Sequence, residues 1–146
     1  MRKKIVKSVA LVLWLILIYS FSSQNGTQSS GLSNGLLTYI GSLLKVANIN
    51  SFVSNFSFLI RKTAHFTEYF ILYFLAYECF KEYTSKDILI ISFAFCALCA
   101  GFDEFHQLFV SGRCGQVKDV LIDSFGSLTC CLIRYLTVKY GRKDNA

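Results

Sequence analysis

Four strongly apolar stretches, residues 5–21, 63–80, 88–105 and 120–138, dominate this chain of 146 residues. A helix that crosses a bilayer needs about 17 to 25 mostly apolar residues. Only 16% of the residues are charged and 53% are hydrophobic, whereas soluble domains carry about 25% charged residues. The sequence therefore predicts an all-α, polytopic helical membrane protein with about four transmembrane helices. Because no Pro-rich or Gly/Ser-rich linker and no repeat divides the chain, a single domain over residues 1–146 is expected.

Two of the stretches, 63–80 and 88–105, are marginal because ionisable side chains interrupt or end them. We still interpret both as spans, because their remaining positions are apolar on every helical face, as in membrane helices. The interrupting residues are His65, Glu68, Glu78, Asp103 and Glu104.

The basic residues orient these spans, since Lys and Arg near the ends of spans are retained in the cytoplasm. Nine of them lie before the first stretch, between the second and third, or after the fourth, which would all be on one side of the membrane. They are Arg2, Lys3, Lys4, Lys7, Lys81, Lys86, Lys139, Arg142 and Lys143. Arg134 is expected to snorkel to the same side. The sequence thus predicts N-in, C-in topology in the cytoplasmic membrane. The outer side receives Lys45, Arg61, Lys62, Arg113 and Lys118.

The first stretch has an alternative interpretation as a secretory signal peptide, because a basic start precedes an apolar run. Ser20 and Ser22 would form a weak cleavage signal. Trp14 and Tyr19 instead favour a retained membrane anchor, since such residues are typical of membrane interfaces.

The outer segment 22–61 is more than a simple loop. Apolar residues recur at helical spacing in two runs, 32–47 and 49–60, with Ser, Asn and Gly between them. We expect two short amphipathic helices that lie on the outer interface or dip into it as a lid. The alternative is that they pack over the bundle.

Ionisable residues gather near the outer ends of three predicted spans. A charge in hydrocarbon costs about 2.5 to 3.5 kcal/mol on insertion scales, so a cluster at one depth indicates a functional site. The alternative is a network of ion pairs that ties the helices together. The candidate binding residues are Arg61, Lys62, His65, Glu68, Asp103, Glu104, His106, Gln107, Arg113, Asp119 and Asp123.

Helical spacing predicts which of these side chains share a face. Arg61, His65 and Glu68 are three and four residues apart and are helical neighbours, with Glu68 about 9 Å below the outer boundary. Asp103 and Gln107 are one turn apart, and Glu104 is expected to turn away from them.

The fourth stretch carries a face of small and polar residues. Asp123, Gly126, Ser127 and Cys130 recur at helical spacing, and Asp119 lies one turn earlier. Small residues let membrane helices approach closely, so this face predicts tight packing. Asp123 is not explained by packing alone.

Three chemistries could use this site. Basic side chains offer paired donors to the phosphate of a headgroup; these are Arg61, Lys62, Arg113 and Lys118. Imidazole and carboxylate groups could hold a divalent metal or perform acid/base catalysis. The catalytic candidates are His65, Glu68, Asp103, His106 and Asp123. The sequence specifies neither a metal nor another cofactor.

Several other function classes lose support. No His-Glu-x-x-His metalloprotease motif and no P-loop is present. No basic stripe interleaved with aromatic residues indicates nucleic-acid binding. Five of the six cysteines fall inside apolar runs, where cysteine behaves as a small hydrophobic residue. Only Cys114 is expected in an outer loop.

Three blocks of the sequence resemble the VanZ-like family of small bacterial membrane proteins. They are Phe21-Ser22-Ser23-Gln24, the Lys-x-x-His-x-x-Glu-Tyr pattern within residues 61–69, and Asp103-Glu104-Phe105-His106-Gln107. Arg113 and residues 119–126 extend the resemblance.

The resemblance implies a role in the bacterial cell envelope. The family is named for a member that confers low-level teicoplanin resistance, although members also occur outside resistance clusters. The expected function is binding of an anionic lipid or a lipid-linked envelope precursor in an outward-facing polar pocket. The alternatives are a membrane-embedded enzyme acting on such a substrate and a structural or partner-binding subunit. The sequence leaves the oligomeric state open.

Overall fold

The computed structural model describes residues 1–84 and 86–141. Arg142 and Lys143, which the sequence places on the cytoplasmic side, lie outside the described residues. The described chain forms helices joined by short connections and contains no strand, which confirms the all-α prediction. The helices are α1 (Arg2–Ser22), α2 (Gly26–Leu43), α3 (Ile49–Phe80), α4 (Ile88–Gln107) and α5 (Val117–Gly141).

Three helices of the described chain are long and apolar enough to cross a membrane: α1, α4 and residues Val117–Tyr140 of α5. The predicted span 63–80 is helical but forms the second half of α3, which is not one of these three. Charged residues and tyrosines lower the mean hydropathy of that half.

The outer segment folds differently from the prediction of two separate short helices. Its first run forms α2, which begins with a capping box between Asn25 and Gln28. Its second run is continuous with the predicted span, so that α3 extends unbroken over 32 residues from the N-cap Asn48. The prediction of a separate second helix is therefore wrong, because no Gly or Pro interrupts the chain between residues 49 and 80.

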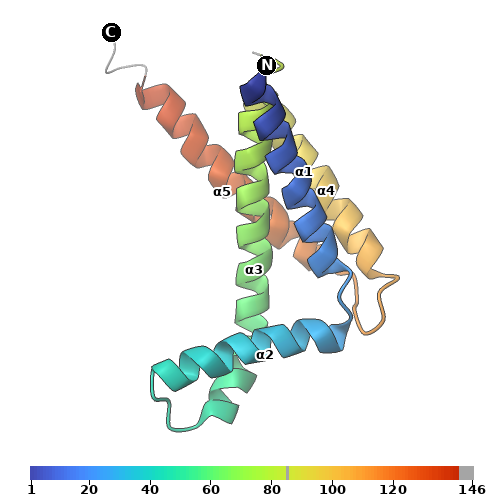
Figure 1. The fold of residues 1–146 in the computed structure, drawn as a ribbon, viewed down its shortest axis with the longest axis vertical. Coiled ribbons are helices and arrows are strands. Elements are labelled where there is room, and N and C mark those ends of the chain that lie inside the picture. The colour runs from blue at the N-terminus through green and yellow to red at the C-terminus, as the bar shows by residue number, and fades with distance from the viewer. Residues whose placement is uncertain (85, 142–146) are drawn as a thin grey trace.

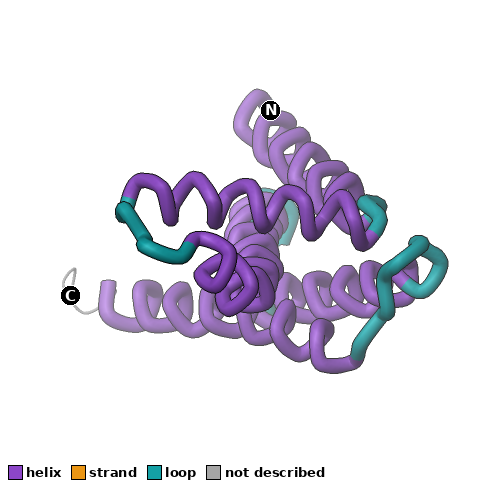
Figure 2. Tube along the Cα trace, turned by 90° about the horizontal axis from the view of Figure 1, so that it is seen from below, coloured by secondary structure: helices purple, strands orange, loops and turns teal. Residues whose placement is uncertain are grey.

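The central helix of the bundle is α3, which packs against each of the other four helices. Figure 1 shows α2 lying across the lower end of this bundle, while the start of α1 and the end of α5 lie at the upper end. The view from below shows α2 crossing beside the end of α3 (Figure 2). We call the end that carries α2 and the loop 108–116 the α2 end.

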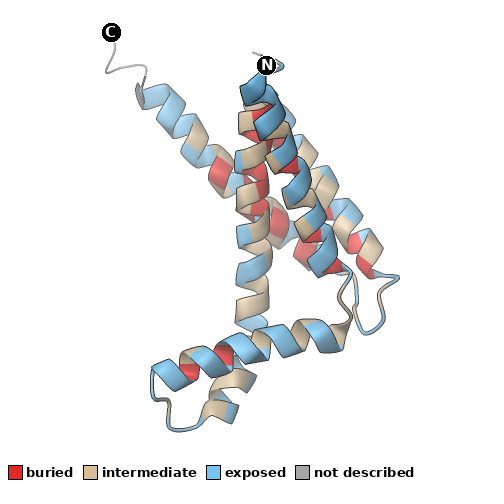
Figure 3. Ribbon diagram, in the orientation of Figure 1, coloured by how far each residue is buried: buried red, intermediate tan, exposed pale blue. Residues whose placement is uncertain are grey.

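The bundle has an apolar core around Tyr69, Leu72 and Tyr73, but it also buries polar side chains and exposes many apolar ones. Ser92, Glu104, Asp123 and Ser127 are buried, and exposed positions follow the outer faces of the helices in Figure 3. Many of the exposed residues are large and apolar; on α4 and α5 they include Ile90, Leu98, Phe102, Leu121, Phe125 and Leu132. Apolar patches of this extent fit contact with lipid.

The close contact of α3 with α5 depends on small side chains, as the sequence predicts. A Cβ atom added to Gly126 would overlap the main-chain carbonyl of Phe66. One residue later, the Ser127 hydroxyl donates a buried hydrogen bond of 3.2 Å to the Tyr69 carbonyl. This contact holds the site residues of the two helices next to each other.

Carboxylates at the opposite end of the bundle are paired. Lys7 donates to Glu78 at 3.1 Å and to Glu82 at 2.6 Å, and its hydrogen bond holds the pKa of the Glu82 carboxyl below its usual range. Arg134 donates to Glu78 at 2.6 Å and stacks on the ring of Phe74. Arg134 therefore joins α5 to α3 at this end of the bundle.

Candidate functional site

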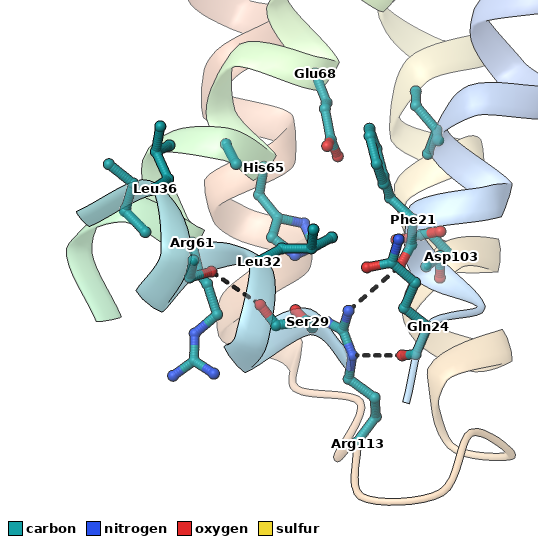
Figure 4. Close-up of a pocket in the computed structure, with 15 residues that line it drawn as sticks. Phe21, Gln24, Ser29, Leu32, Leu36, Arg61, His65, Glu68, Asp103 and Arg113 are labelled. Carbon is teal, nitrogen blue, oxygen red and sulfur yellow. Dashed lines mark hydrogen bonds between the residues drawn. The ribbon is translucent and has the colours of Figure 1, made fainter. Parts of the chain in front are cut away.

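A cavity of about 270 Å³ lies at the α2 end, between α1, α2 and α3. Its walls combine apolar side chains with ionisable ones. The apolar residues include Ile18, Phe21, Leu32, Leu36 and Ile60. The ionisable residues are Arg61, His65, Glu68, Asp103 and Arg113, all labelled in Figure 4. Five predicted site residues from three parts of the chain thus meet at one hollow.

A second, more open hollow adjoins this cavity. Arg61 and Arg113 line both hollows, and the N-terminal part of α2 completes the outer one with residues including Ser30 and Asn34. The two arginines therefore mark the passage between the cavity and the outside of the bundle.

The loop 108–116 positions Arg113. Its Nε donates to the Gln24 carbonyl at 3.1 Å, and its Nη2 donates to the Phe21 carbonyl at 3.3 Å. The loop is fixed to the start of α2, where the Gly26 amide donates to the Ser111 carbonyl at 3.1 Å. A side chain at Gly26 would overlap the Gly112 carbonyl, so this approach requires glycine.

Arg61 is held more loosely. Its Nη1 donates to the Ser30 hydroxyl at 3.1 Å. Its guanidinium group points away from His65 and Glu68 in Figure 4, toward the outer hollow. Since a guanidinium has five N–H donors, Arg61 keeps donors for a ligand.

A histidine and three carboxylates form a compact cluster behind the cavity wall. His65 of α3, Asp103 and Glu104 of α4, and Asp123 of α5 each offer one ligand atom, and these atoms lie within 4.8 Å of one another. We call these four residues the acidic cluster. His65 Nδ1 lies 3.3 Å from Asp123 Oδ1. His65 and Asp103 also line the cavity.

Glu104 corrects one prediction. The sequence suggests that it turns away from Asp103, but the structure buries it within the acidic cluster. Its Oε2 accepts a hydrogen bond of 2.8 Å from the Gln116 amide. The spacing within α4 could not show this, because the contact depends on the loop that returns to α5.

The remaining predicted residues lie beside the cavity and the cluster. Lys62 forms an ion pair with buried Asp119. The ring of His106 contacts the Tyr19 ring, with centroids 4.9 Å apart. Gln107 donates to Asp103 at 3.1 Å. Exposed Lys118 lines neither hollow. None of these residues belongs to the acidic cluster.

Sequence reasoning did not assign site roles to Gln24 or Gln116. Both act through main-chain atoms: the Gln24 carbonyl binds Arg113, and the Gln116 amide binds Glu104. Gln24 closes one of the family-like blocks, which is a sequence signal for its position. Main-chain contacts leave no such signal at Gln116.

Residues 31–35 have the spacing Gly-x-Ser-x-Gly, with Ser33 on the cavity wall. In serine hydrolases this motif forms a sharp turn between a strand and a helix. Here it lies inside α2, where the Ser33 hydroxyl donates to the Ser29 carbonyl at 3.0 Å. The local structure is therefore not that of a nucleophile elbow.

The family described as VanZ/LLP1 matches residues 8–138, which include all the residues that line the cavity and all four of the acidic cluster. No significant match was found among curated proteins or among solved structures. The apolar helices fit a membrane protein, as the family match does. Since the match covers most of its length, the chain belongs to the VanZ/LLP1 family.

Proposed function

We propose that the cavity binds the anionic headgroup of a membrane lipid or of a lipid-linked cell-envelope precursor. The observation that carries this proposal is the position of Arg61 and Arg113, which line both the cavity and the hollow outside it. Two guanidinium groups at one passage can hold a phosphate through charge-assisted hydrogen bonds. The apolar wall formed by Ile18, Leu32 and Leu36 would contact the adjoining hydrocarbon.

The proposal includes four spans with N-in, C-in topology in the bacterial cytoplasmic membrane. In this arrangement the second half of α3 crosses the membrane in addition to α1, α4 and α5. The helix α2 lies near the outer interface. The start of α1 and the end of α5 share the bundle end opposite α2 (Figure 1), and basic residues flank that end, as expected for the cytoplasmic side. The cavity then opens to the outside.

Burial explains how a polar cavity is compatible with a membrane helix. The Glu68 side chain points into the cavity beside His65 in Figure 4. Its main-chain carbonyl accepts a hydrogen bond of 3.0 Å from the Trp14 indole. The carboxylate thus lies inside the bundle, where charged membrane residues are normally found. We propose that Glu68 and His65 shape the pocket and select the headgroup.

Substitution of the arginines tests the proposal. Purified protein in detergent would be titrated with phosphatidylglycerol and with phosphatidylcholine, and bound lipid would be counted by native mass spectrometry. We expect the wild type to prefer phosphatidylglycerol. Arg61→Gln and Arg113→Gln should each weaken that binding at least tenfold, because a hydrogen bond to a charged group contributes about 1.5 to 3 kcal/mol.

Lys86→Gln is the matched control, since Lys86 is exposed in the turn at the opposite end. It should retain the affinity of the wild type. Because Arg113 also fixes the loop, thermal unfolding of each variant would be measured in parallel. Unchanged affinity in both arginine variants, or no preference for the anionic lipid in the wild type, would refute headgroup binding.

A second candidate function is acid/base or metal-assisted chemistry on a lipid-linked substrate. It is favoured by His65 and Asp103, which belong to the acidic cluster and also face the cavity. Turnover unaffected by His65→Ala and by Glu68→Ala would exclude this function. A purely structural subunit and a contribution to teicoplanin resistance stay predictions from the family resemblance.

A further inference from the structure

We propose that the acidic cluster, His65, Asp103, Glu104 and Asp123, binds one divalent cation of the Mn²⁺ or Zn²⁺ type. The cluster unites three helices, and its ligand atoms lie within 4.8 Å of one another. The inference is independent of headgroup binding, because Arg61 and Arg113 do not belong to the cluster.

The first argument is that Asp123 is fully buried without a hydrogen-bond partner in the described chain. Its exposed fraction is 0%, and neither carboxylate oxygen has a hydrogen-bond partner among the described residues. Oε1 of Glu104 and Nδ1 of His65 are also buried without such a partner. A buried polar atom without a partner costs free energy, and a charged one costs more, so a ligand that pairs with these atoms together would stabilise the folded protein.

The second argument is the missing counter-charge. Three carboxylates elsewhere in the described chain have basic partners: Asp119 pairs with Lys62, Glu78 pairs with Lys7 and Arg134, and Glu82 pairs with Lys7. No Lys or Arg among the described residues forms an ion pair with Asp103, Glu104 or Asp123. His65 is the single basic neighbour, at 3.3 Å from Asp123. A divalent cation would neutralise this concentration of carboxylates.

The geometry suits a metal ion after the side chains draw together. Ligand atoms about 2.1 Å from a metal lie about 3.4 Å apart in a tetrahedral site and at most about 4.2 Å apart in an octahedral one, whereas those of the cluster lie within 4.8 Å of one another. One imidazole and three carboxylates form a mixed nitrogen and oxygen set, suited to Zn²⁺ or Mn²⁺.

The surrounding main chain supports the cluster. The Gln116 amide fixes Oε2 of Glu104 at 2.8 Å and leaves Oε1 free for the cation. The close approach at Gly126 holds the α5 ligand against the α3 ligand. Contacts to the ligating side chains from the surrounding protein orient the ligands of metal sites in this way.

The cation would also reach the cavity. His65 and Asp103 line the cavity wall, so an open coordination position on that side could accept a phosphate or carboxylate oxygen. A bound cation and the two arginines would then face the same anion from different sides.

Metal uptake by the purified protein tests the inference. Protein stripped with a chelator would be dialysed against Mn²⁺ or Zn²⁺ and its metal content measured by mass spectrometry, without added lipid. We expect about one ion per chain in the wild type and at least a tenfold loss of affinity in Asp123→Asn and in Glu104→Gln. Asp87→Asn, at the opposite end of α4, is the matched control and should bind like the wild type.

A second measurement separates binding from folding. A cation that binds only the folded protein raises its unfolding temperature with increasing cation concentration. We expect this rise in the wild type and in Asp87→Asn, and its absence in Asp123→Asn and Glu104→Gln. Circular dichroism would check that the variants keep their helical content.

Two results would overturn the inference: less than a tenth of an equivalent of either metal in the wild type, or equal uptake in the wild type and in both cluster variants. Arg61→Gln should keep its metal, so intact metal uptake together with unchanged lipid affinity in Arg61→Gln and Arg113→Gln would refute headgroup binding and leave the cation site standing.

Discussion

Gly126→Ala is expected to destabilise the bundle by about 3 kcal/mol, near the upper limit of overpacking substitutions. A methyl group there would overlap the Phe66 carbonyl of α3, and a main-chain atom cannot move aside as a side chain can. The helices must separate, which also stretches the Ser127 to Tyr69 hydrogen bond of 3.2 Å. Reversible unfolding in mixed micelles would measure the loss.

Gly101→Ala is the matched control. Gly101 also lies inside a helix, α4, but a Cβ atom there meets nothing within 4 Å. Because alanine is a better helix former than glycine, this variant should be more stable by about 0.5 to 1 kcal/mol. Equal effects of the two substitutions would show that the α3–α5 contact is not close-packed.

Lys62→Met should cost about 3 kcal/mol, because it leaves the buried carboxylate of Asp119 without its partner. Methionine keeps much of the apolar stem of lysine, so the change reports mainly the lost charge. Unfolding in mixed micelles would again be the measurement. Lys118→Met, at an exposed position on the same side of the bundle, should change stability by less than about 0.5 kcal/mol.

A double-mutant cycle makes this prediction specific. Adding Asp119→Asn to Lys62→Met removes the unpaired charge and should restore a large part of the lost stability. If Lys62 instead serves only as a headgroup ligand, Lys62→Met would weaken lipid binding and leave the unfolding free energy unchanged.

The sequence predicts the spatial grouping of the site well, because the grouping depends on helical periodicity and on the ends of apolar runs. His65, Asp103 and Asp123 begin or end predicted spans, and antiparallel helices bring such ends together. The small-residue face with Gly126 and Ser127 is predicted for the same reason, since small side chains recur at helical spacing.

The sequence does not predict contacts that depend on the path of a loop or on the rotation of one helix against another. The burial of Glu104 depends on the Gln116 amide, which the loop 108–116 brings to it. The pairing of Lys62 with Asp119 depends on the rotation of α5 against α3, and a sequence does not fix this rotation.

The prediction that residues 49–60 form a separate helix is wrong because it relies on a change of polarity. Residues 49–60 have an amphipathic pattern and residues 63–80 have an apolar one, which suggests separate elements. A change of polarity does not break a helix, and α3 runs through the change. Continuity places Arg61 on the same rigid element as His65 and Glu68, which fixes the spacing between the proposed anion ligand and the acidic cluster.

The sidedness of Cys114 tests most directly the central claim that the cavity opens to the outside of the cell. Cys114 is an exposed, free thiol in the loop at the α2 end, next to Arg113. Two variants with a single cysteine would be compared: one keeps only Cys114, and the other carries Lys86→Cys and lacks the six native cysteines. Intact cells that express each variant would be treated with a membrane-impermeant maleimide. We expect labelling at position 114 without permeabilisation and at position 86 only after it; the reverse pattern would contradict the account.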